Sequence, residues 1–425
     1  MKTPVFLWLL LSFLSIFGKT DNPSENQFGG VLYEYPYINS LPSEQSPVPE
    51  GYEPFHLEHY GRHGSRNMLS KEDYDIPVQN LEKAEKAGKL TPLGHKTLDY
   101  LRKLQKGSRD KLGELTPKGA LQHRVIGNRM ARNFPQIFTP GADLSAVSTI
   151  VNRCIMSMNN SVAGINEVVP GLEFITDSSK DNMWFMNFKD EEALNIRARV
   201  NTLVLDKYRD SLMRESAFLS RLVTDPEFAG KHVSPGLLPR LYWALSSTQN
   251  NDDNPLMLEE VFGHDDLLMN WNYGNARRFL LGGNSKLTNN RMPFSQRHLL
   301  RQIINHTDSA IAKGTPGANL RYGHDDVLMP LLVLMELDNF GIEINSFEEL
   351  ETSGWHDYDI TPMAGNLQLV FYRPIGKYAP EEILVKAMIN ECEASMPGSP
   401  VDGPYYKWEE IKKYYLKKLE KSGLD

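Results

Sequence analysis

The sequence predicts an α/β protein whose body is interrupted by a helical insertion. Short apolar, strand-like segments occur before residue 150 and again after residue 316, and two of them run directly into segments with helical spacing of apolar side chains. Between these parts, residues from about 175 to 315 show helical spacing almost throughout. Strand-to-helix segments on both sides of a helical stretch predict one sheet-containing body with a helical domain inserted into it.

The composition is that of an ordinary globular protein without a general affinity for anions. The 425 residues are 40% apolar and 24% charged, and the net charge is −8. An acidic chain has no general electrostatic attraction to nucleic acids or to anionic membranes. We therefore expect small-molecule ligands and no nucleic-acid partner, and any anion site must be built from locally clustered cations.

The N-terminal segment has the pattern of a signal peptide over residues 1–20. Lys2 supplies a positive charge, and the run Pro4–Phe17 is almost wholly apolar. That run is shorter than the about 20 residues needed to cross a bilayer, and Gly18 and Thr20 offer a cleavage site. The pattern predicts an exported protein, periplasmic or extracellular, with no membrane span. The alternative is a buried N-terminal helix.

The first part of the α/β body is predicted over residues 51–174. Before it, residues 21–50 are rich in Pro, Ser, Asn and Glu and predict an extended N-terminal arm. Pro54 and Gly61 bracket a predicted strand, Phe55–Gly61. Leucine and alanine residues between positions 81 and 104 then have helical spacing.

A helix, a strand and a second helix complete this first part. In "LTPKGALQHRVIGNRM", Thr116 is a predicted N-cap and Pro117 the first helical residue. Residues 142–149 are strand-like, and "NRCIMSMNNSVAGI" returns to helical spacing. The predicted helical cap insertion occupies residues 175–315.

The second part of the body is predicted over residues 316–425. "ANLRYGHDDVLMPLLVLMEL" indicates a strand, a turn and an apolar helix, and "NLQLVFYRP" a further strand. The chain ends in a predicted amphipathic helix with four apolar residues on one side: Trp408, Ile411, Tyr415 and Leu419.

The segment "RHGSR" carries the clearest chemistry in the sequence. It forms the loop at the carboxyl end of the first predicted strand, where open α/β sheets bind ligands. The guanidinium groups of Arg62 and Arg66 repel each other unless an anion lies between them, and arginine matches phosphate oxygens. His63, held neutral, could attack phosphorus, while Gly64 would permit a sharp turn and a close ligand approach. The loop therefore predicts a phosphate pocket with a covalent histidine.

Two simpler interpretations of this loop remain open on the residues alone. The arginines could be solvated in a surface loop. Alternatively, His56, His59 and His63 have the spacing of one helix face and could hold a metal. Pro54 and Gly61 argue against a helix, and a strand would place His56 and His59 on opposite faces. We therefore expect neither a metal nor another cofactor.

Four segments together resemble the histidine phosphatases, in the branch that includes acid phosphatases and phytases. "RHGSR" resembles the R-H-G-x-R signature, "NRCIMS" the second arginine segment, and "LRYGHDD" the C-terminal H-D or H-A-E element. "LTPKGALQHRVIGNRM" resembles the helix between the first two. The resemblance spans about residues 52–375 and implies a Rossmann-like, doubly wound sheet with an inserted α-helical cap.

The resemblance also implies roles for individual residues. His63 would be the nucleophile that becomes phosphohistidine, and Asp325 the proton donor. Four side chains would bind the phosphate: Arg62, Arg66, Arg153 and His324. The neighbourhoods of Arg153 and His324 are most similar to multiple inositol polyphosphate phosphatases, which implies substrates such as phytate. A general acid phosphatase acting on sugar or other small phosphates, and a binding protein without turnover, are the alternatives.

The family pattern helps to choose between the two aspartates that follow His324. Relatives with an aspartate donor carry it directly after the histidine, whereas those with the donor two positions on use the longer glutamate. Asp325 is therefore the expected donor, and Asp326 would favour the helix dipole and raise the pKa of Asp325 by repulsion. "GHDD" also occurs at Gly263–Asp266; we expect His264 to lie at a helix boundary rather than in the site.

The remaining predictions concern the insertion and the cysteines. Four cations of the insertion are candidate ligands for further phosphates: Lys180, Lys189, Arg197 and Arg199. Ordinary helix-surface charge explains them equally well. Cys154 and Cys392 are predicted to be buried small hydrophobes, and the sequence leaves open whether they pair and what the oligomeric state is.

Overall fold

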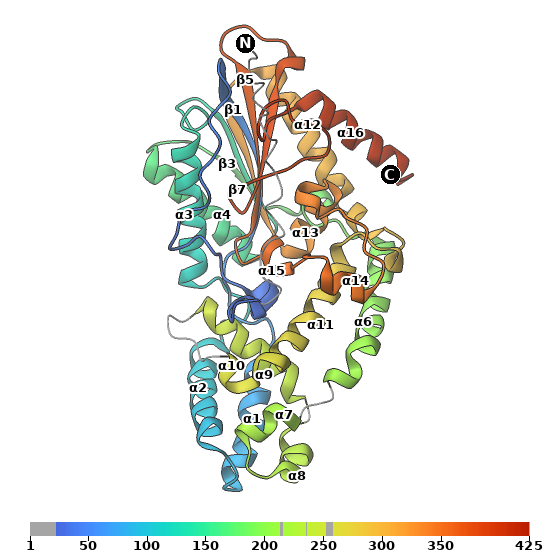
Figure 1. Cartoon of the computed structure of the whole chain (residues 1–425). Coiled ribbons are helices and arrows are strands. Elements are labelled where there is room, and N and C mark those ends of the chain that lie inside the picture. Colours follow the sequence, from blue (N-terminus) through green and yellow to red (C-terminus); the bar gives the residue numbers. More distant parts are fainter. Residues whose placement is uncertain (1–22, 213–215, 235, 252–257, 425) are drawn as a thin grey trace, which may run out of the picture.

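A mixed β-sheet forms the upper half of the molecule and a group of helices the lower half (Figure 1). The computed structural model describes residues 23–212, 216–234, 236–251 and 258–424, so the predicted signal peptide lies outside the described residues. The strand order is β3-β2-β4-β1-β5-β6-β7, with β8 paired to β6. The strands are β1 Tyr52–Arg62, β2 Asp143–Ser148, β3 Ile175–Asp177, β4 Gly317–Gly323, β5 Asn366–Pro374, β6 Leu384–Ile389, β7 Cys392–Ala394 and β8 Tyr406–Lys407.

The first four strands of the sheet are parallel, and the register aligns their carboxyl ends. β1 pairs with β4 up to Arg62 opposite Gly323, and β2 pairs with β4 up to Ser148 opposite Tyr322. β5 runs antiparallel to β1, and β6 to β8 continue the antiparallel half. Three loops that leave parallel strands therefore emerge at one edge of the sheet.

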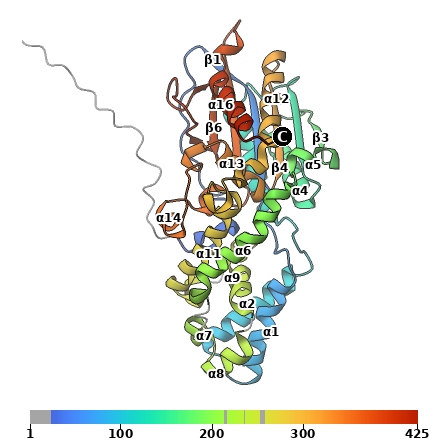
Figure 2. The same ribbon diagram turned by 90° about the vertical axis from the view of Figure 1, so that its right-hand side faces the viewer.

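Helices cover both faces of the sheet, which confirms the predicted doubly wound α/β fold (Figures 1 and 2). α3 (Pro117–Asn133) and α4 (Asn152–Val168) pack on one face. α12 (Arg297–Lys313), α13 (Asp325–Leu334) and α16 (Trp408–Lys421) pack on the other. Sheet side chains are buried on both sides, as expected for central strands between two helical layers.

Several local sequence signals are confirmed. At the start of α3, the Thr116 hydroxyl accepts a hydrogen bond from the Gly119 N–H (3.1 Å), with Pro117 as the first helical residue. β5 has the bounds of the predicted strand. α16 buries the four apolar residues predicted to share one side: Trp408, Ile411, Tyr415 and Leu419.

The lower helices share an apolar core of their own, separate from the two sides of the sheet. They are α1 Glu72–Lys86, α2 Pro92–Ser108, α7 Ser216–Leu222, α8 Pro226–Phe228, α9 Leu237–Ser246 and α10 Leu258–Phe262. The predicted first part of the body contained α1 and α2, but their apolar faces pack against α7 and α9. Helical spacing in the sequence shows that a helix has an apolar face, but only the tertiary fold determines which other helix packs against that face.

Two long helices link the lower group to the sheet. α6 (Glu191–Leu212) and α11 (His264–Gly282) rise from it toward the sheet (Figure 2). α11 contributes Leu267 and Trp271 to the lower core and Phe279 and Leu280 to the core beside the sheet. None of the described helices is long and apolar enough to cross a membrane.

The predicted N-terminal arm is packed into the molecule where it can be described. It begins with a short 3-10 segment, η1 (Gln27–Leu32), in which Phe28, Val31 and Leu32 are buried. Both cysteines are free: Cys154 is buried as predicted, but Cys392 is only partly buried, which corrects the second expectation.

Candidate active site

Three chain segments that are distant in sequence meet at the carboxyl edge of the parallel strands. The His63 N–H donates to the Gly323 carbonyl (2.9 Å), and the Thr149 N–H donates to the Tyr322 carbonyl (3.0 Å), so the loops after β1, β2 and β4 are held together. This is the edge at which α/β sheets bind ligands. The six predicted site residues gather here and interact electrostatically: Arg62, His63, Arg66, Arg153, His324 and Asp325.

His63 is held as a neutral imidazole with one nitrogen available for attack. Its Nδ1 lies 2.9 Å from the Gly64 carbonyl oxygen, and because a carbonyl can only accept, Nδ1 must carry the proton. The lone pair therefore resides on Nε2. Burial, and next the positive charges of Arg62, Arg153 and Arg66, lower the pKa of His63 well below its usual value.

Gly64 is required by a helix rather than by a ligand. A Cβ at Gly64 would lie 2.4 Å from the Gly119 carbonyl oxygen, and one at Gly119 would lie 2.2 Å from the Ser65 carbonyl oxygen. The Thr116 N–H also donates to the Ser65 carbonyl (2.9 Å). The start of α3 thus presses against the loop, which differs from the predicted role of Gly64 in ligand approach.

The three arginines offer buried donors that the protein leaves unused. Arg62 is anchored because its Nη1 donates to the carbonyls of Val31 (2.6 Å) and Thr361 (2.7 Å). The Nε atoms of Arg62, Arg66 and Arg153 are buried and have no hydrogen-bond acceptor among the described residues. Buried cationic donors normally have partners, so this arrangement suits an anion with several oxygens.

Repulsion between these guanidinium groups contributes to lower pKa values for the arginines. Burial, and next the charges of Arg62 and Arg153, lower the pKa of Arg66 to about 9. Burial also lowers the pKa of Arg62, against the opposing effect of Asp325. An anion bound between these groups would relieve this repulsion.

His324 faces His63 across the site. The two ring centroids are 5.7 Å apart, with the rings inclined at 74°. Nε2 of His324 lies 3.2 Å from the Thr149 hydroxyl, and its backbone N–H donates to the Tyr60 hydroxyl (3.3 Å). Burial lowers the pKa of His324.

Asp325 is clamped between two arginines. Its Oδ2 lies 2.8 Å from Nη1 of Arg278, and its Oδ1 lies 3.7 Å from Nε of Arg62. Burial alone would raise the pKa of Asp325, but Arg62 and Arg278 hold it well below the usual value. The expectation that Asp326 would raise this pKa is therefore wrong for the protein without substrate, because two arginines outweigh one neighbouring carboxylate.

Arg278 is a site residue that the sequence did not reveal. It lies on α11 within "NARRFLL", which is typical of any helix with one charged side. Asp357, at the start of α15 (Asp357–Ile360), was also missed; it is buried, accepts a hydrogen bond from Trp271 Nε1 (3.1 Å) and interacts with the charge of Arg278. No local pattern marks either residue, because the docking of α11 brings Arg278 to Asp325, and Asp357 comes from a separate segment, α15.

Asp326 lies at the margin of the site and is more exposed than Asp325. Its side chain is 35% exposed, against 15% for Asp325, and its Oδ2 lies 3.3 Å from Nη2 of Arg197. It stands in the first turn of α13, as predicted. The two consecutive aspartates thus have different surroundings, and only Asp325 contacts the arginines of the centre.

The other histidines that the sequence singled out lie apart from the centre. His264 is the first residue of α11, with Nδ1 3.2 Å from Glu259 Oε1, as predicted for a helix boundary. His56 lies within β1, where its Nε2 is 2.8 Å from Glu58 Oε1. The described part of the chain contains no cluster of three or more histidine, cysteine, aspartate or glutamate side chains that could hold a metal.

Comparisons with known proteins agree with this geometry. The family model described as the histidine phosphatase superfamily, branch 2, matches residues 61–390. A multiple inositol polyphosphate phosphatase from Bifidobacterium longum, solved in complex with phosphate, superimposes with a TM-score of 0.71 at 20% identity, covering 92% of this chain and 97% of that chain. No curated protein sequence matches this chain.

Two phytases are similar at lower identity. The phytase from D. castellii has a TM-score of 0.60 at 14% identity, covering 93% of this chain and 85% of that one. The phytase from Hafnia alvei has a TM-score of 0.52 at 14% identity, covering 88% and 98%. At such identities the likeness establishes a shared fold.

Proposed function

The chain belongs to branch 2 of the histidine phosphatase superfamily and is a phosphatase, and from this premise we propose that it hydrolyses inositol polyphosphates through a phosphohistidine intermediate. One observation carries the mechanism: a neutral imidazole with a free Nε2 lies among buried guanidinium donors that lack acceptors. This combination provides a nucleophile and the charge that a transferring phosphoryl group requires.

In the first step, Nε2 of His63 attacks phosphorus and the bond to the ester oxygen breaks. Arg62, Arg66 and Arg153 neutralise the equatorial oxygens, together with His324. The proton stays on Nδ1 of His63 and is donated in a hydrogen bond to the Gly64 carbonyl, which stabilises the positive charge that the ring acquires. The leaving alkoxide takes its proton from Asp325, so the alcohol departs neutral.

The acidity of Asp325 must change on substrate binding for this step to work. Without substrate, Arg62 and Arg278 keep the carboxylate ionised. A bound phosphate brings negative charge to the same arginines and offsets their effect, so the pKa of Asp325 rises in the complex. In the second step Asp325, again a carboxylate, takes a proton from the water that cleaves the phosphohistidine.

The proposed substrate rests on the structural neighbours and on surplus positive charge. The B. longum enzyme was solved with inositol hexasulfate, an analogue of a fully phosphorylated inositol. Beyond the arginines that bind the reacting phosphate, Arg277 and Arg278 border the site from α11, and Arg197 reaches it through its ion pair with Asp326. Lys189, another predicted ligand, bonds instead to Asn187 (2.9 Å).

Phosphate release from inositol hexakisphosphate and from glucose 6-phosphate tests the substrate assignment. We expect a higher kcat/KM for the inositol hexakisphosphate, because its additional phosphates can bind Arg277, Arg278 and Arg197. Equal kcat/KM values for the two substrates would contradict this assignment and favour a general acid phosphatase.

Activity should persist in EDTA, because guanidinium groups supply the positive charge of the site. A loss of activity that a divalent ion restores would contradict this prediction.

Export is a separate part of the proposal and rests on the N-terminal sequence. Residues 1–20 have a positive start, an apolar core and small residues at the end. The expected result is a mature protein, outside the cytoplasm, whose N-terminal sequence starts close to residue 21. An intact N-terminus on cytoplasmic protein would contradict export.

A further inference from the structure

The hydrogen bond that fixes the tautomer of His63 ends on a peptide group that is itself bonded to a buried side chain. The Gly64 carbonyl lies 2.9 Å from His63 Nδ1 and accepts its proton. The N–H of the same peptide group, which belongs to Ser65, donates to Oε1 of Gln122 (2.9 Å). Gln122 lies on α3 and is fully buried. It therefore bonds to the far side of the group that holds the proton of the nucleophile.

The surrounding hydrogen bonds leave one orientation for the Gln122 side-chain amide. A backbone N–H can only donate, so the amide oxygen faces the Ser65 nitrogen. The amide nitrogen donates to the Ser65 hydroxyl (2.9 Å), and this hydroxyl donates to Oδ1 of Asn250 (2.7 Å). Asn250 is oriented in turn, because its Nδ2 donates to the Leu32 carbonyl (3.0 Å). A directed chain of hydrogen bonds therefore joins His63 to η1.

Every donor in this chain points away from His63, so the bonds reinforce one another. A peptide group whose N–H is hydrogen-bonded carries more negative charge on its oxygen, and linked hydrogen bonds strengthen each other in this way. Gln122 therefore makes the Gly64 carbonyl a better acceptor for the Nδ1 proton. The hydrogen bond at one nitrogen of an imidazole decides which of the two nitrogens is protonated.

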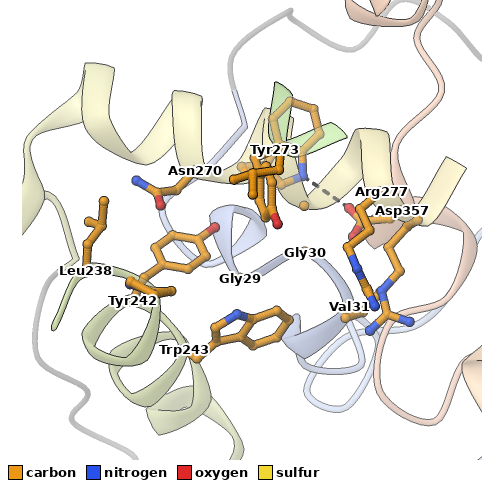
Figure 3. A pocket seen from close by; sticks show the side chains of 15 residues that line it. Gly29, Gly30, Val31, Leu238, Tyr242, Trp243, Asn270, Tyr273, Arg277 and Asp357 are labelled. Atoms are coloured by element: carbon orange, nitrogen blue, oxygen red, sulfur yellow. Dashed lines mark hydrogen bonds between the residues drawn. The ribbon is translucent and has the colours of Figure 1, made fainter. Parts of the chain in front are cut away.

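The chain of hydrogen bonds ends on the segment that also anchors Arg62. Val31 and Leu32 both belong to η1, and the Val31 carbonyl accepts a hydrogen bond from Arg62 Nη1 (2.6 Å). Figure 3 shows Val31 in the wall of the cavity beside the site, close to Arg277 and Asp357. One short segment thus supports both the nucleophile and an arginine beside it.

We propose that Gln122 is a positioning residue for phosphoryl transfer, which acts through the Gly64–Ser65 peptide group to keep the proton of His63 on Nδ1 and the lone pair on Nε2. The inference rests on the proposed function, in which Nε2 attacks phosphorus. Gln122 itself gains and loses no proton. The Nε2–phosphorus bond forms as the phosphorus–oxygen ester bond breaks, the Nδ1 proton stays on the ring, and the alcohol leaves with the proton of Asp325.

Ser157 offers a matched control in the same loop. Its hydroxyl accepts a hydrogen bond from the Gly64 N–H (3.1 Å), which belongs to the peptide group before the one that accepts the Nδ1 proton. Ser157 is fully buried, like Gln122, and lies on the neighbouring helix α4. Gln122→Met and Ser157→Ala each remove the acceptor of one backbone N–H, but only Gln122→Met alters the peptide group bonded to His63.

A rapid-quench measurement of phosphoenzyme formation separates positioning from a general loosening of the loop. Gln122→Met should lower the rate by at least about tenfold, the lower end of the loss seen when the group that orients a metal-bound histidine is removed. Ser157→Ala should lower it by less than about threefold, the scale of one neutral hydrogen bond. Inhibition by inorganic phosphate should change less than about twofold in either variant, because the arginines are untouched. A smaller loss in Gln122→Met, an equal loss in Ser157→Ala, or a parallel weakening of phosphate inhibition would overturn the proposal.

Nitrogen NMR of histidine-labelled protein without substrate tests the same inference without turnover. His63 should be protonated at Nδ1 in the wild type and in Ser157→Ala, whereas the tautomer protonated at Nε2 should appear in Gln122→Met. An unchanged tautomer in Gln122→Met would overturn the proposal. If instead the wild type forms no phosphoenzyme, the proposed function fails while the tautomer result still decides the role of Gln122.

A second substitution keeps the test decisive if Gln122→Met does not fold. Gln122→Glu retains an oxygen that can accept from the Ser65 N–H, and burial favours the neutral acid, which can also donate to the Ser65 hydroxyl. This variant should keep the wild-type tautomer of His63 and a rate of phosphoenzyme formation within about threefold of the wild type. Loss of the Nδ1 proton, or a tenfold lower rate with intact phosphate inhibition, would overturn the proposal.

Discussion

The tetrapeptide Gly-His-Asp-Asp occurs twice in this chain, and its two copies have different environments. Gly263–Asp266 opens α11 in the lower helical group, where His264 is half-exposed and lies beside Glu259. Gly323–Asp326 joins β4 to α13, where His324 is buried opposite His63. Both copies begin a helix, so a helix N-terminus alone does not distinguish them.

The difference comes from what precedes each copy. The second copy follows a parallel strand whose neighbours deliver Arg62 and Arg153 to the same edge, whereas the first follows the short helix α10. The first copy still contributes indirectly, since the helix that it begins carries Arg278 to Asp325 of the second. Chemistry here depends on position in the sheet, and matched substitutions in the two copies can test this.

Replacing the aspartate after each histidine should give the largest difference. Asp325→Asn should lower kcat by about 10²–10⁴-fold for substrates with poor leaving groups, because general acid catalysis is lost. The loss should be smaller for p-nitrophenyl phosphate, whose leaving group needs little protonation. Asp265→Asn, at an exposed site in α11, should change kcat less than twofold. If Asp326→Asn shows the leaving-group-dependent loss instead, the donor assignment is reversed.

Replacing the two histidines should give the next largest difference. His324→Ala should lower kcat by about 10²–10³-fold, the usual effect of removing one donor to a developing oxyanion. His264→Ala should retain wild-type turnover. Steady-state kinetics with one substrate compare the two variants directly. A similar loss of kcat in both would contradict the claim that only the copy at the end of a parallel strand takes part in catalysis.

The low pKa of His63 predicts how the nucleophile responds to pH. Because burial and three arginines lower this pKa, the neutral, reactive imidazole should persist as the pH falls below about 6.5, the usual histidine value. It should be lost only when the pH falls through the lowered value. Arg66→Leu removes one of the charges and should shift the titration toward higher pH. Histidine NMR of the protein without substrate measures both, and titration of wild-type His63 at or above the usual value would contradict the prediction.

The smallest effects are expected at the last aspartate of each copy. Asp326 and Asp266 both stand in the first turn of a helix, so replacing either by asparagine should reduce the free energy of unfolding by about 0.3–1 kcal/mol. Thermal unfolding at low and high salt measures this, and salt should reduce the difference. We expect neither variant to lose more than tenfold in turnover. Such a loss in Asp326→Asn alone would contradict the expectation that the last aspartate has the same role in both copies.

Sequence reasoning succeeded where the signal is local. Thr116 with Pro117 marks the start of α3, and the strand-to-helix junctions place Arg153 and His324 at one edge of a sheet. It also separated the two Gly-His-Asp-Asp copies, because the residues before each copy differ in pattern.

It failed where a partner comes from elsewhere in the fold. Arg278 reaches Asp325 only because α11 docks against α13, and the low pKa of Asp325 follows from Arg62 and Arg278 rather than from its neighbour in the chain. The role of Gly64 depends in the same way on the approach of α3. Chain neighbours are visible in a sequence, whereas these spatial neighbours are not.

The most direct test of the account is a rapid-quench experiment with radiolabelled substrate. During the first turnover, the enzyme should carry an acid-labile, base-stable label, and peptide mapping should place it on His63. Asp325→Asn should still form this intermediate from p-nitrophenyl phosphate, and His63→Ala should not. No labelled enzyme in the wild type, or a label on His324 or His264, would contradict the proposal that His63 is the nucleophile.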